Sequence, residues 1–299
     1  MAVGSTISSV DYNTIRDKII NILGSGSGQV GYGQTASIMS SSVSAGTQVT
    51  KAQWDNLRYD IYNVLAHQTS TAPSIYQVSQ GETIKYGASV PNTLYNTLAD
   101  TALTNKFNIG LGQYVVVVGT YAPPRILGWT TSLSSTVTVT FASADAARYF
   151  FNSGGKLRFT STRSGGSTSP QNTAWSALLN SVGSVDFGGN LPSSLVNFYT
   201  TNNTTDKVVV SATPSGVYST GSYNITVRSN VVNNTTGGAT ELIFTVTWAD
   251  SYTGNLDLIN GTLDLVINEV RASGVMLPSG NNPFFITSPT YSATAISGT

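Results

Sequence analysis

The sequence predicts a mainly β protein with α-helices, in which a short helical N-terminal region precedes an antiparallel β-sandwich carrying one inserted helix. Residues 1–112 form the helical docking or assembly region in this prediction, and residues 113–299 form the sandwich domain. Three observations support it. Apolar residues recur at helical spacing in three segments of the first part, they alternate with polar residues in the second part, and helical spacing returns once among the alternating segments.

The first three predicted helices have recognisable ends. The first stops at Gly24, because glycine favours helix C-termini. The second begins at Thr50, whose spacing from Gln53 fits a capping box, and the third begins near Ser89–Pro91. Their apolar residues are Val10, Ile15, Ile19, Ile22 and Leu23; Trp54, Leu57, Ile61, Val64 and Leu65; and Leu94, Leu98 and Ala102. Such short helices bury little alone, so we expect them to pack on each other, on the β part or on a neighbouring subunit.

From about Gln113 the period changes to two, which is typical of strands with one buried and one polar face. The clearest predicted strands are Thr136–Phe141, Lys156–Thr160, Ser222–Arg228 and Glu241–Trp248. Between them, Ser169 followed by Pro170 is a helix cap with proline at the first helical position. The inserted helix that follows has its apolar residues at Trp175, Leu178, Leu179 and Val182.

Asn260-Gly261 predicts a two-residue hairpin turn. The resulting register pairs Leu258 with Leu263, Leu256 with Leu265 and, on the opposite face, Asp257 with Asp264. Two carboxylates directly opposite each other lie about 5 Å apart at Cβ and repel. They can point apart into solvent, hold a cation such as Ca²⁺, share a proton, or act as a glycosidase pair. Asp257 and Asp264 are the only metal site that the sequence suggests.

Two further features are candidates for chemistry. Gly24–Gly33 is glycine-rich like a phosphate-binding loop, but it follows a predicted helix and lacks the Gly-Lys-Ser/Thr ending, so we expect a flexible spacer. His67 is the single histidine, and any Ser-His-Asp triad would have to use it. At the end of the second helix we expect it to act as a cationic C-terminal cap instead.

Composition excludes several classes of function. Charged residues make up 9% of the chain, and residues 1–112 carry six basic and six acidic groups while residues 113–299 carry eight of each. A nucleic-acid binder that neutralises phosphates is therefore not expected. With no cysteine and one histidine, disulfides, thiolate zinc sites and His-rich metal sites are excluded. No other cofactor is expected.

Location and surface chemistry follow from similar arguments. The longest apolar run, Tyr114–Val118, is far too short to span a membrane, and the N-terminus lacks the pattern of a signal peptide. The Asn-x-Thr sites at Asn224 and Asn234 carry little weight without such a signal. Fifteen tyrosines and many Ser, Thr and Asn residues are compatible with a glycan-binding surface, and also with ordinary packing.

Two stretches carry a resemblance to a known group of proteins. The first runs from Val10-Asp11-Tyr12-Asn13 to Gly31-Tyr32-Gly33-Gln34 and continues in the Trp54–His67 helix. The second is Ala146-Ala147-Arg148-Tyr149-Phe150-Phe151-Asn152-Ser153-Gly154-Gly155, followed by Leu157-Arg158-Phe159, Arg163-Ser164-Gly165-Gly166 and Gln171-Asn172-Thr173-Ala174-Trp175. Together they resemble virion structural proteins of tailed bacteriophages, especially contractile-tailed cyanophages.

The resemblance implies a non-enzymatic component of the virion, synthesised in the cytoplasm of the bacterial host. A tail, neck, baseplate or fibre protein is the leading hypothesis, with the N-terminal region mediating assembly. A capsid decoration protein and a host-receptor or glycan-binding module are the alternatives. The expected partners are other virion proteins, further copies of the chain in a homo-oligomer, and a host surface glycan. No catalytic residues follow from the resemblance.

Overall fold

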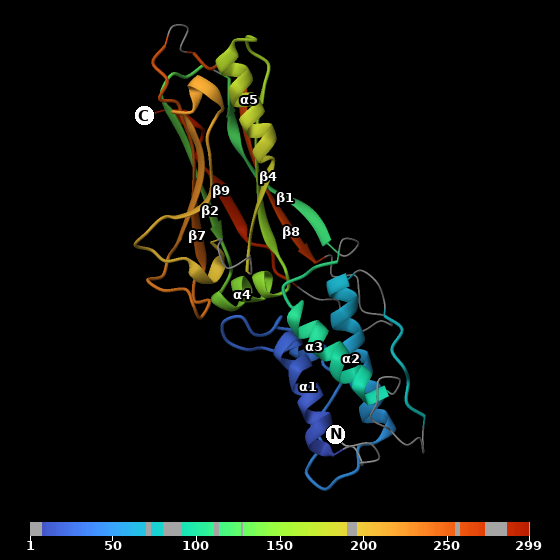
Figure 1. The fold of residues 1–299 in the computed structure, drawn as a ribbon. Coiled ribbons are helices and arrows are strands. Elements are labelled where there is room, and N and C mark those ends of the chain that lie inside the picture. Colours follow the sequence, from blue (N-terminus) through green and yellow to red (C-terminus); the bar gives the residue numbers. More distant parts are fainter. Residues whose placement is uncertain are drawn as a thin grey trace. The chain divides into compact units, whose positions relative to one another are not determined.

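The computed structural model describes residues 8–69, 73–79, 91–110, 114–126, 128–189, 196–254, 258–272 and 286–298. In this part of the chain, α-helices accompany two antiparallel sheets (Figure 1), which confirms the predicted fold class. The chain divides into two compact units. The helical unit comprises Met1–Val115, Tyr149–Gly155 and Arg271–Ile286, and the sandwich unit comprises Val116–Arg148, Lys156–Val270 and Thr287–Thr299. Tyr149–Gly155 thus belongs to the helical unit although it follows the predicted boundary at residue 112.

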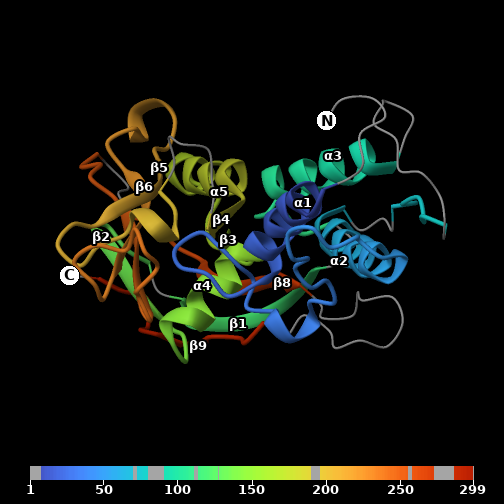
Figure 2. The same ribbon diagram turned by 90° about the horizontal axis from the view of Figure 1, so that it is seen from below.

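Among the described residues, three whole helices lie in the helical unit: α1 (Ser9–Leu23), α2 (Lys51–Thr69) and α3 (Pro91–Thr104). They lie side by side in Figures 1 and 2. The predicted capping box of α2 is confirmed, because the main-chain N–H of Thr50 donates to Gln53 Oε1 at 2.8 Å and that of Gln53 donates to Thr50 Oγ1 at 3.3 Å. The predicted stop of α1 at Gly24 is also confirmed. None of the described helices is long and apolar enough to cross a membrane.

Aromatic side chains from all three helices meet in the core of the helical unit. The ring of Trp54 on α2 lies 5.3 Å from Tyr12 of α1 and 5.2 Å from Tyr95 of α3, measured between centroids. Most of the predicted apolar residues are buried with them. Val10 and Leu94 are exceptions, with 67% and 39% of their surfaces exposed. The three helices therefore share one core, as expected for amphipathic helices that are too short to be stable alone.

Both sheets lie in the sandwich unit except for the first two residues of β1 and the last two of β8. One has the strand order β1 (Tyr114–Arg125), β8 (Thr262–Ala272), β3 (Lys156–Ser164) and β4 (Ser184–Gly188). The other has the order β10 (Ser297–Gly298), β2 (Ser132–Thr140), β7 (Glu241–Ala249), β6 (Ser222–Ser229) and β5 (Lys207–Ala212), and β9 (Thr290–Ala293) also pairs with β2. The four strands predicted from alternation correspond to β2, β3, β6 and β7.

The inner faces of the two sheets contact each other through aromatic rings. Phe244 of β7 lies 4.6 Å from Phe159 of β3 and 5.1 Å from Phe187 of β4, between centroids. A polar contact also crosses this core, because the hydroxyl oxygens of Ser161 and Tyr223 are 3.0 Å apart. Burial raises the pKa of Tyr223 to about 12, so its phenol stays neutral. A buried hydroxyl pair thus links β3 to β6 within this core.

In the described residues after 113, two α-helices interrupt the strands, rather than the single one predicted. The predicted helix is α5 (Pro170–Val182), and Ser169 caps it by accepting the N–H of Asn172 at 3.3 Å. The second is α4 (Ala144–Asn152), which the sequence analysis did not identify. Its apolar residues Ala147, Phe150 and Phe151 recur at helical spacing and are fully buried, and Ser143 Oγ accepts the N–H of Ala146 at 3.0 Å as a cap would, so both signals were present in the sequence. The described residues also form three short 3₁₀ turns: η1 (Thr35–Ser37), η2 (Phe198–Thr200) and η3 (Gly216–Tyr218).

The hairpin predicted at Asn260-Gly261 is wrong in its register. Leu258 is 46% exposed while Leu263 is fully buried, so the two do not share a face. Ile259 instead forms a bridge with Trp129, and β8 begins only at Thr262 and pairs with β3. Tertiary pairing has overridden the local turn signal.

Candidate functional site

An extended segment in the helical unit, residues 38–49, connects η1 to α2; we call it the strap. It contains neither helix nor strand, so its main-chain N–H and C=O groups need other partners where they are buried. Val43 is buried in the core of the unit, and Ile38 and Val49 pack against that core. The strap is therefore part of the folded unit.

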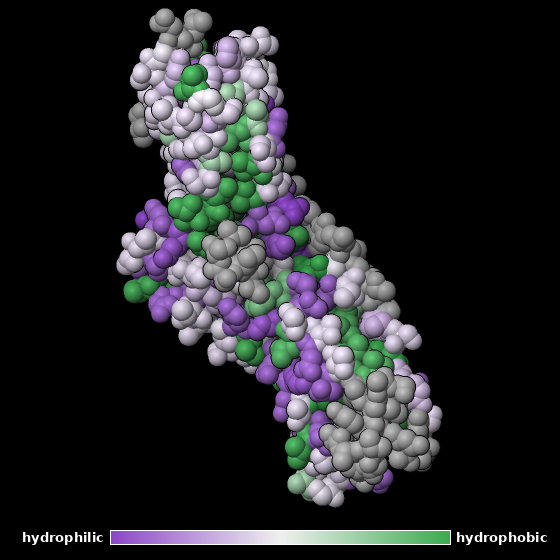
Figure 3. All heavy atoms as spheres, in the orientation of Figure 1, coloured by the Kyte–Doolittle hydropathy of each residue, from purple (hydrophilic) through white to green (hydrophobic). Residues whose placement is uncertain are grey.

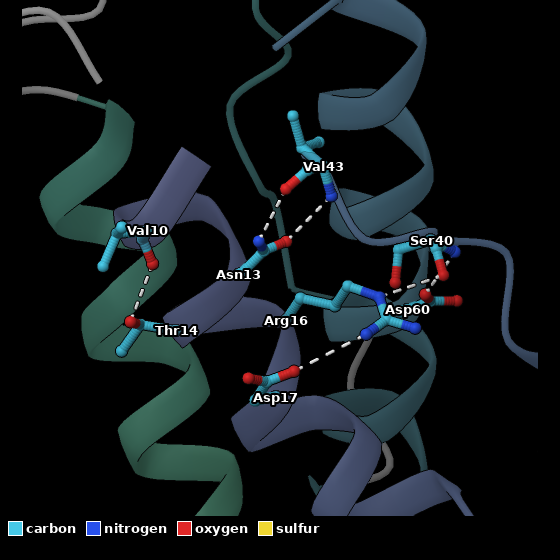
Figure 4. Close-up of polar contacts among 8 residues, drawn as sticks. All are labelled: Val10, Asn13, Thr14, Arg16, Asp17, Ser40, Val43 and Asp60. Atoms are coloured by element: carbon cyan, nitrogen blue, oxygen red, sulfur yellow. Dashed lines mark hydrogen bonds and ion pairs between the residues drawn. The ribbon is translucent and has the colours of Figure 1, made fainter. Parts of the chain in front are cut away.

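Asn13 of α1 holds the middle of the strap. Its Nδ2 donates to the carbonyl oxygen of Val43 at 2.8 Å, and its Oδ1 accepts the N–H of Val43 at 3.0 Å (Figure 4). A side-chain amide that engages both main-chain groups of one residue replaces the pairing that a neighbouring strand would supply. Helix α1 thereby fixes the backbone at Val43.

Asp60 of α2 holds the beginning of the strap. This aspartate is completely buried, and its carboxylate accepts the N–H of Met39 at 3.0 Å and the N–H of Ser40 at 2.8 Å. Arg16 of α1 donates from Nε to the carbonyl oxygen of Ser40 at 3.2 Å (Figure 4). Burial raises the pKa of Asp60 above its ordinary value, and the hydrogen bonds from Ser40 and Met39 and the charge of Arg16 oppose that rise.

The outer side of the strap carries uncharged side chains. Ser41, Ser42 and residues 44–48 are exposed, and Met39 exposes 38% of its surface. The side chains of Asn13 and Asp60 bond to the main chain of the strap from its inner side. The arrangement presents a polar surface on a backbone that is fixed at two points.

His67 does not act as the predicted cationic cap. It is buried near the end of α2, and its Nε2 lies 2.7 Å from the carbonyl oxygen of Ser153. Burial lowers its pKa to about 4, although the hydrogen bond to Ser153 opposes the shift. The imidazole is therefore neutral near pH 7, and it donates to Ser153 because a carbonyl can only accept. Burial therefore outweighs the attraction of the helix dipole for a cation at this end of α2.

The predicted flexible spacer over Gly24–Gly33 is instead tied to its surroundings. Gly33 donates its N–H to the carbonyl oxygen of Gly24 at 3.0 Å. Asn152, buried in the same unit, donates from Nδ2 to the carbonyl oxygens of Gly28 at 3.1 Å and Gly31 at 2.9 Å. Main-chain oxygens of this loop are thus occupied by an amide donor, which is unlike a phosphate-binding loop that offers N–H groups.

The candidate cation pair is only half described. Asp257 lies outside the described residues. Asp264 lies on β8 opposite Thr162 of β3 and is half-buried. In the part of the chain that the structure describes, no cluster of three or more His, Asp or Glu side chains could hold a metal ion. A Ca²⁺ site at Asp257 and Asp264 therefore stays a prediction, and the pairing on which it depends is not found at Leu258 and Leu263.

Three motifs that the sequence analysis singled out separately come together in the sandwich unit. Asn260 Oδ1 accepts the N–H of Ser167 at 2.8 Å and the Nδ2 of Asn172 at 2.9 Å, while the N–H of Asn260 donates to Asn172 Oδ1 at 3.0 Å. Arg163 donates from Nη1 to Ser176 Oγ at 2.9 Å. Because these groups engage one another, the network ties two loops to α5.

Sequence reasoning missed the residues that fasten loops, among them Asn13, Asp60 and Asn152. Asn234 is another: it is completely buried, donates to the carbonyl oxygen of Phe198 at 2.7 Å and accepts the N–H of Ala239 at 2.8 Å. It cannot carry a glycan in this state. Only the composition could have indicated such residues, since a chain with few charges must satisfy buried main-chain groups with amides and hydroxyls.

The strap is the best-defined candidate surface in the helical unit, because α1 and α2 both hold its backbone while its polar side chains face outward. The chain was also compared with known proteins. No protein family, curated protein or solved structure matches the chain.

Proposed function

We propose that the protein is a non-enzymatic structural subunit of a tailed-phage virion, in the tail, neck, baseplate or fibre, and that its helical unit docks on neighbouring virion proteins. The sequence resemblance supports the class of protein. The observation that carries the docking role is the strap, whose backbone is fixed by Asn13 and Asp60 while its uncharged side chains are exposed.

A fixed strap suits assembly for an energetic reason. Binding through a loop requires that the loop adopt one conformation, and this costs free energy unless the free protein already holds it there. The hydrogen bonds to Val43, Met39 and Ser40 supply that order before any partner arrives. An uncharged contact surface also depends little on salt, since few screened ion pairs contribute. This property suits a particle that must persist outside the cell.

A strap variant tests the proposal in assembling particles. Ser42→Arg places a bulky charge on the exposed strap, and Thr236→Arg places the same charge at an exposed position of the sandwich unit as the matched control. We expect incorporation of the Ser42→Arg protein into particles to fall at least about tenfold, with the control unaffected. Equal incorporation of both variants would refute docking through the strap.

A further inference from the structure

A pair of tyrosines on two loops of the sandwich unit forms an aromatic surface that the proposed docking does not use. Tyr218 ends η3, and Tyr252 lies in the loop after β7. Their ring centroids are 4.8 Å apart and the rings meet edge to face, with an interplanar angle of 67°. Both residues are partly exposed, and the phenol of Tyr252 lies against Gly254, where an added Cβ would be 2.0 Å from the phenolic oxygen. Within the described part of the chain, no residue forms a hydrogen bond with either phenolic oxygen.

The loop that carries Tyr218 is supported from below by α5. The N–H of Ser219 donates to the carbonyl oxygen of Gly216 at 3.2 Å, and the N–H of Gly221 donates to that of Tyr218 at 2.9 Å. Gly221 lies so close to the buried Trp175 that a Cβ added there would be 3.2 Å from Trp175 Cζ2. Two turns and the indole beneath thus hold Tyr218 in place.

The loop that carries Tyr252 is supported by the same helix. Asp250 is buried, and its Oδ1 accepts the N–H of Tyr252 at 3.3 Å while its Oδ2 accepts Nε2 of Gln171, on α5, at 2.8 Å. The N–H of Asp250 donates to the carbonyl oxygen of Thr131 at 3.1 Å. The two tyrosines therefore share a support on α5, which favours a pre-organised binding surface.

The two loops that carry the pair expose uncharged side chains. In residues 213–221 and 250–254 the only charged side chain is that of Asp250, which is buried and hydrogen-bonded. The exposed neighbours are hydroxyl side chains and Val217, which exposes 68% of its surface. In Figure 3 the end of the sandwich unit at the top of the view is mostly pale, as residues of intermediate hydropathy are. An anionic ligand would need arginine or lysine partners.

We propose that Tyr218 and Tyr252 bind a neutral saccharide, as found in an uncharged surface polysaccharide. A sugar ring has an apolar face of C–H groups that can cover an aromatic ring, and its hydroxyls can bond to the two phenols and the nearby Ser and Thr side chains. Binding sites of this kind combine aromatic rings with a few placed polar groups. Tyr218 and Tyr252 supply both the rings and the polar groups on loops that α5 supports. Binding of this kind requires no charged side chain.

Calorimetric titration of the full chain with neutral oligosaccharides tests this site, using maltohexaose, cellohexaose and α-1,6-linked mannohexaose as probes and polygalacturonate as the anionic comparison. We expect at least one neutral probe to bind and Tyr218→Ala or Tyr252→Ala to weaken it about tenfold. Val232→Ala, an exposed apolar position of the same unit, is the matched control and should bind like wild type. Tyr218→Phe and Tyr252→Phe keep the rings, so they should weaken binding less than the alanine variants.

Several results would overturn the assignment. These are failure of every neutral probe to bind, equal binding by wild type and both alanine variants, or a preference for polygalacturonate. Thermal unfolding of each variant shows whether it is folded, and the phenylalanine variants provide the comparison if an alanine variant is not. Light scattering that finds a dimer lost in Tyr218→Ala, without saccharide binding, would identify the pair as a contact between copies of the chain instead.

Discussion

The carboxylate of Asp60 accepts the main-chain N–H of Ser40 at 2.8 Å, which joins the strap to a helix that begins only after the strap ends. The same carboxylate accepts the N–H of Met39. Asn13, on α1, donates to the carbonyl oxygen of Val43. These contacts give residues 38–49 a defined backbone without helix or strand. The proposed docking role depends on them, so they are the first contacts to alter.

Removing the acceptor at position 60 should release the beginning of the strap. Asp60→Ala leaves the N–H groups of Met39 and Ser40 without their partner in a buried place, which costs about 1–3 kcal/mol. We expect the amide hydrogens of Met39 and Ser40 to exchange with solvent at least about tenfold faster in this variant. Asp55→Ala, an aspartate on the same helix that accepts no strap N–H, is the control. Unchanged protection at Ser40 would contradict the assigned clamp.

His67 should make the helical unit less stable in mild acid. Its pKa of about 4 in the folded protein lies below the unfolded value of about 6.5, so the folded state favours the neutral ring. Stability is therefore full above pH 6.5 and falls as pH decreases toward 4, by about 3 kcal/mol over the whole interval.

Comparison with His67→Gln isolates this contribution, because glutamine can still donate to the carbonyl oxygen of Ser153 but does not titrate. Asp60 has the opposite pH dependence. Because burial raises its pKa in the folded protein, its contribution to stability is full below pH 3.8 and decreases as the pH rises through the raised pKa. Urea unfolding between pH 4 and pH 7 should show a smaller loss of stability on acidification for His67→Gln than for wild type. Parallel pH dependences would show that His67 is not responsible.

Two glycines with positive φ should respond differently to alanine. Gly31 has φ +86°, and a Cβ there would lie 2.0 Å from the carbonyl oxygen of Gly24. Gly46 in the strap has φ +79° with nothing within 4 Å of its Cβ position. Gly46→Ala should cost only the backbone strain of about 1–2 kcal/mol, and Gly31→Ala should cost more because the loop must also move. Thermal unfolding of both variants gives the comparison, and equal losses would contradict it.

The amide network of the sandwich unit should contribute measurably to stability. Asn172→Ala removes the acceptor of the Asn260 N–H and one of the donors to Asn260 Oδ1, which keeps the N–H of Ser167, and we expect a loss of about 2 kcal/mol. Asn203 is exposed, and Asn203→Ala provides the control with an expected change within about 0.5 kcal/mol. Chemical unfolding followed by the fluorescence of the sandwich tryptophans measures both. Similar values for the two variants would show that the network is dispensable.

The sequence predicted the parts of this fold that local patterns control. Helical spacing located α1, α2, α3 and α5, the capping residues Thr50 and Ser169 marked helix ends, and alternation located four strands. It failed where distant residues decide the outcome. Ile259 pairs with Trp129 rather than within a hairpin, and burial against Ser153 keeps His67 neutral.

The candidate site could not be found from the sequence for the same reason. Asn13 and Asp60 bond to the main chain 20 to 30 residues away, and such contacts leave no periodic or spacing pattern. Tyr218 and Tyr252 likewise become neighbours only because both loops rest on α5. The composition did indicate which side chains hold the loops, since a chain with few charges must satisfy buried main-chain groups with amides and hydroxyls.

Docking of the helical unit through the strap is most directly tested by site-specific photo-crosslinking in assembled particles. A photoreactive amino acid replaces Ser42 on the strap in one variant and Thr236 on the sandwich unit in the other. The account predicts that Ser42 crosslinks to another virion protein and that Thr236 does not. Particles that contain the Ser42 variant but yield no crosslinked product from it, under conditions where a positive-control position reacts, would contradict the account.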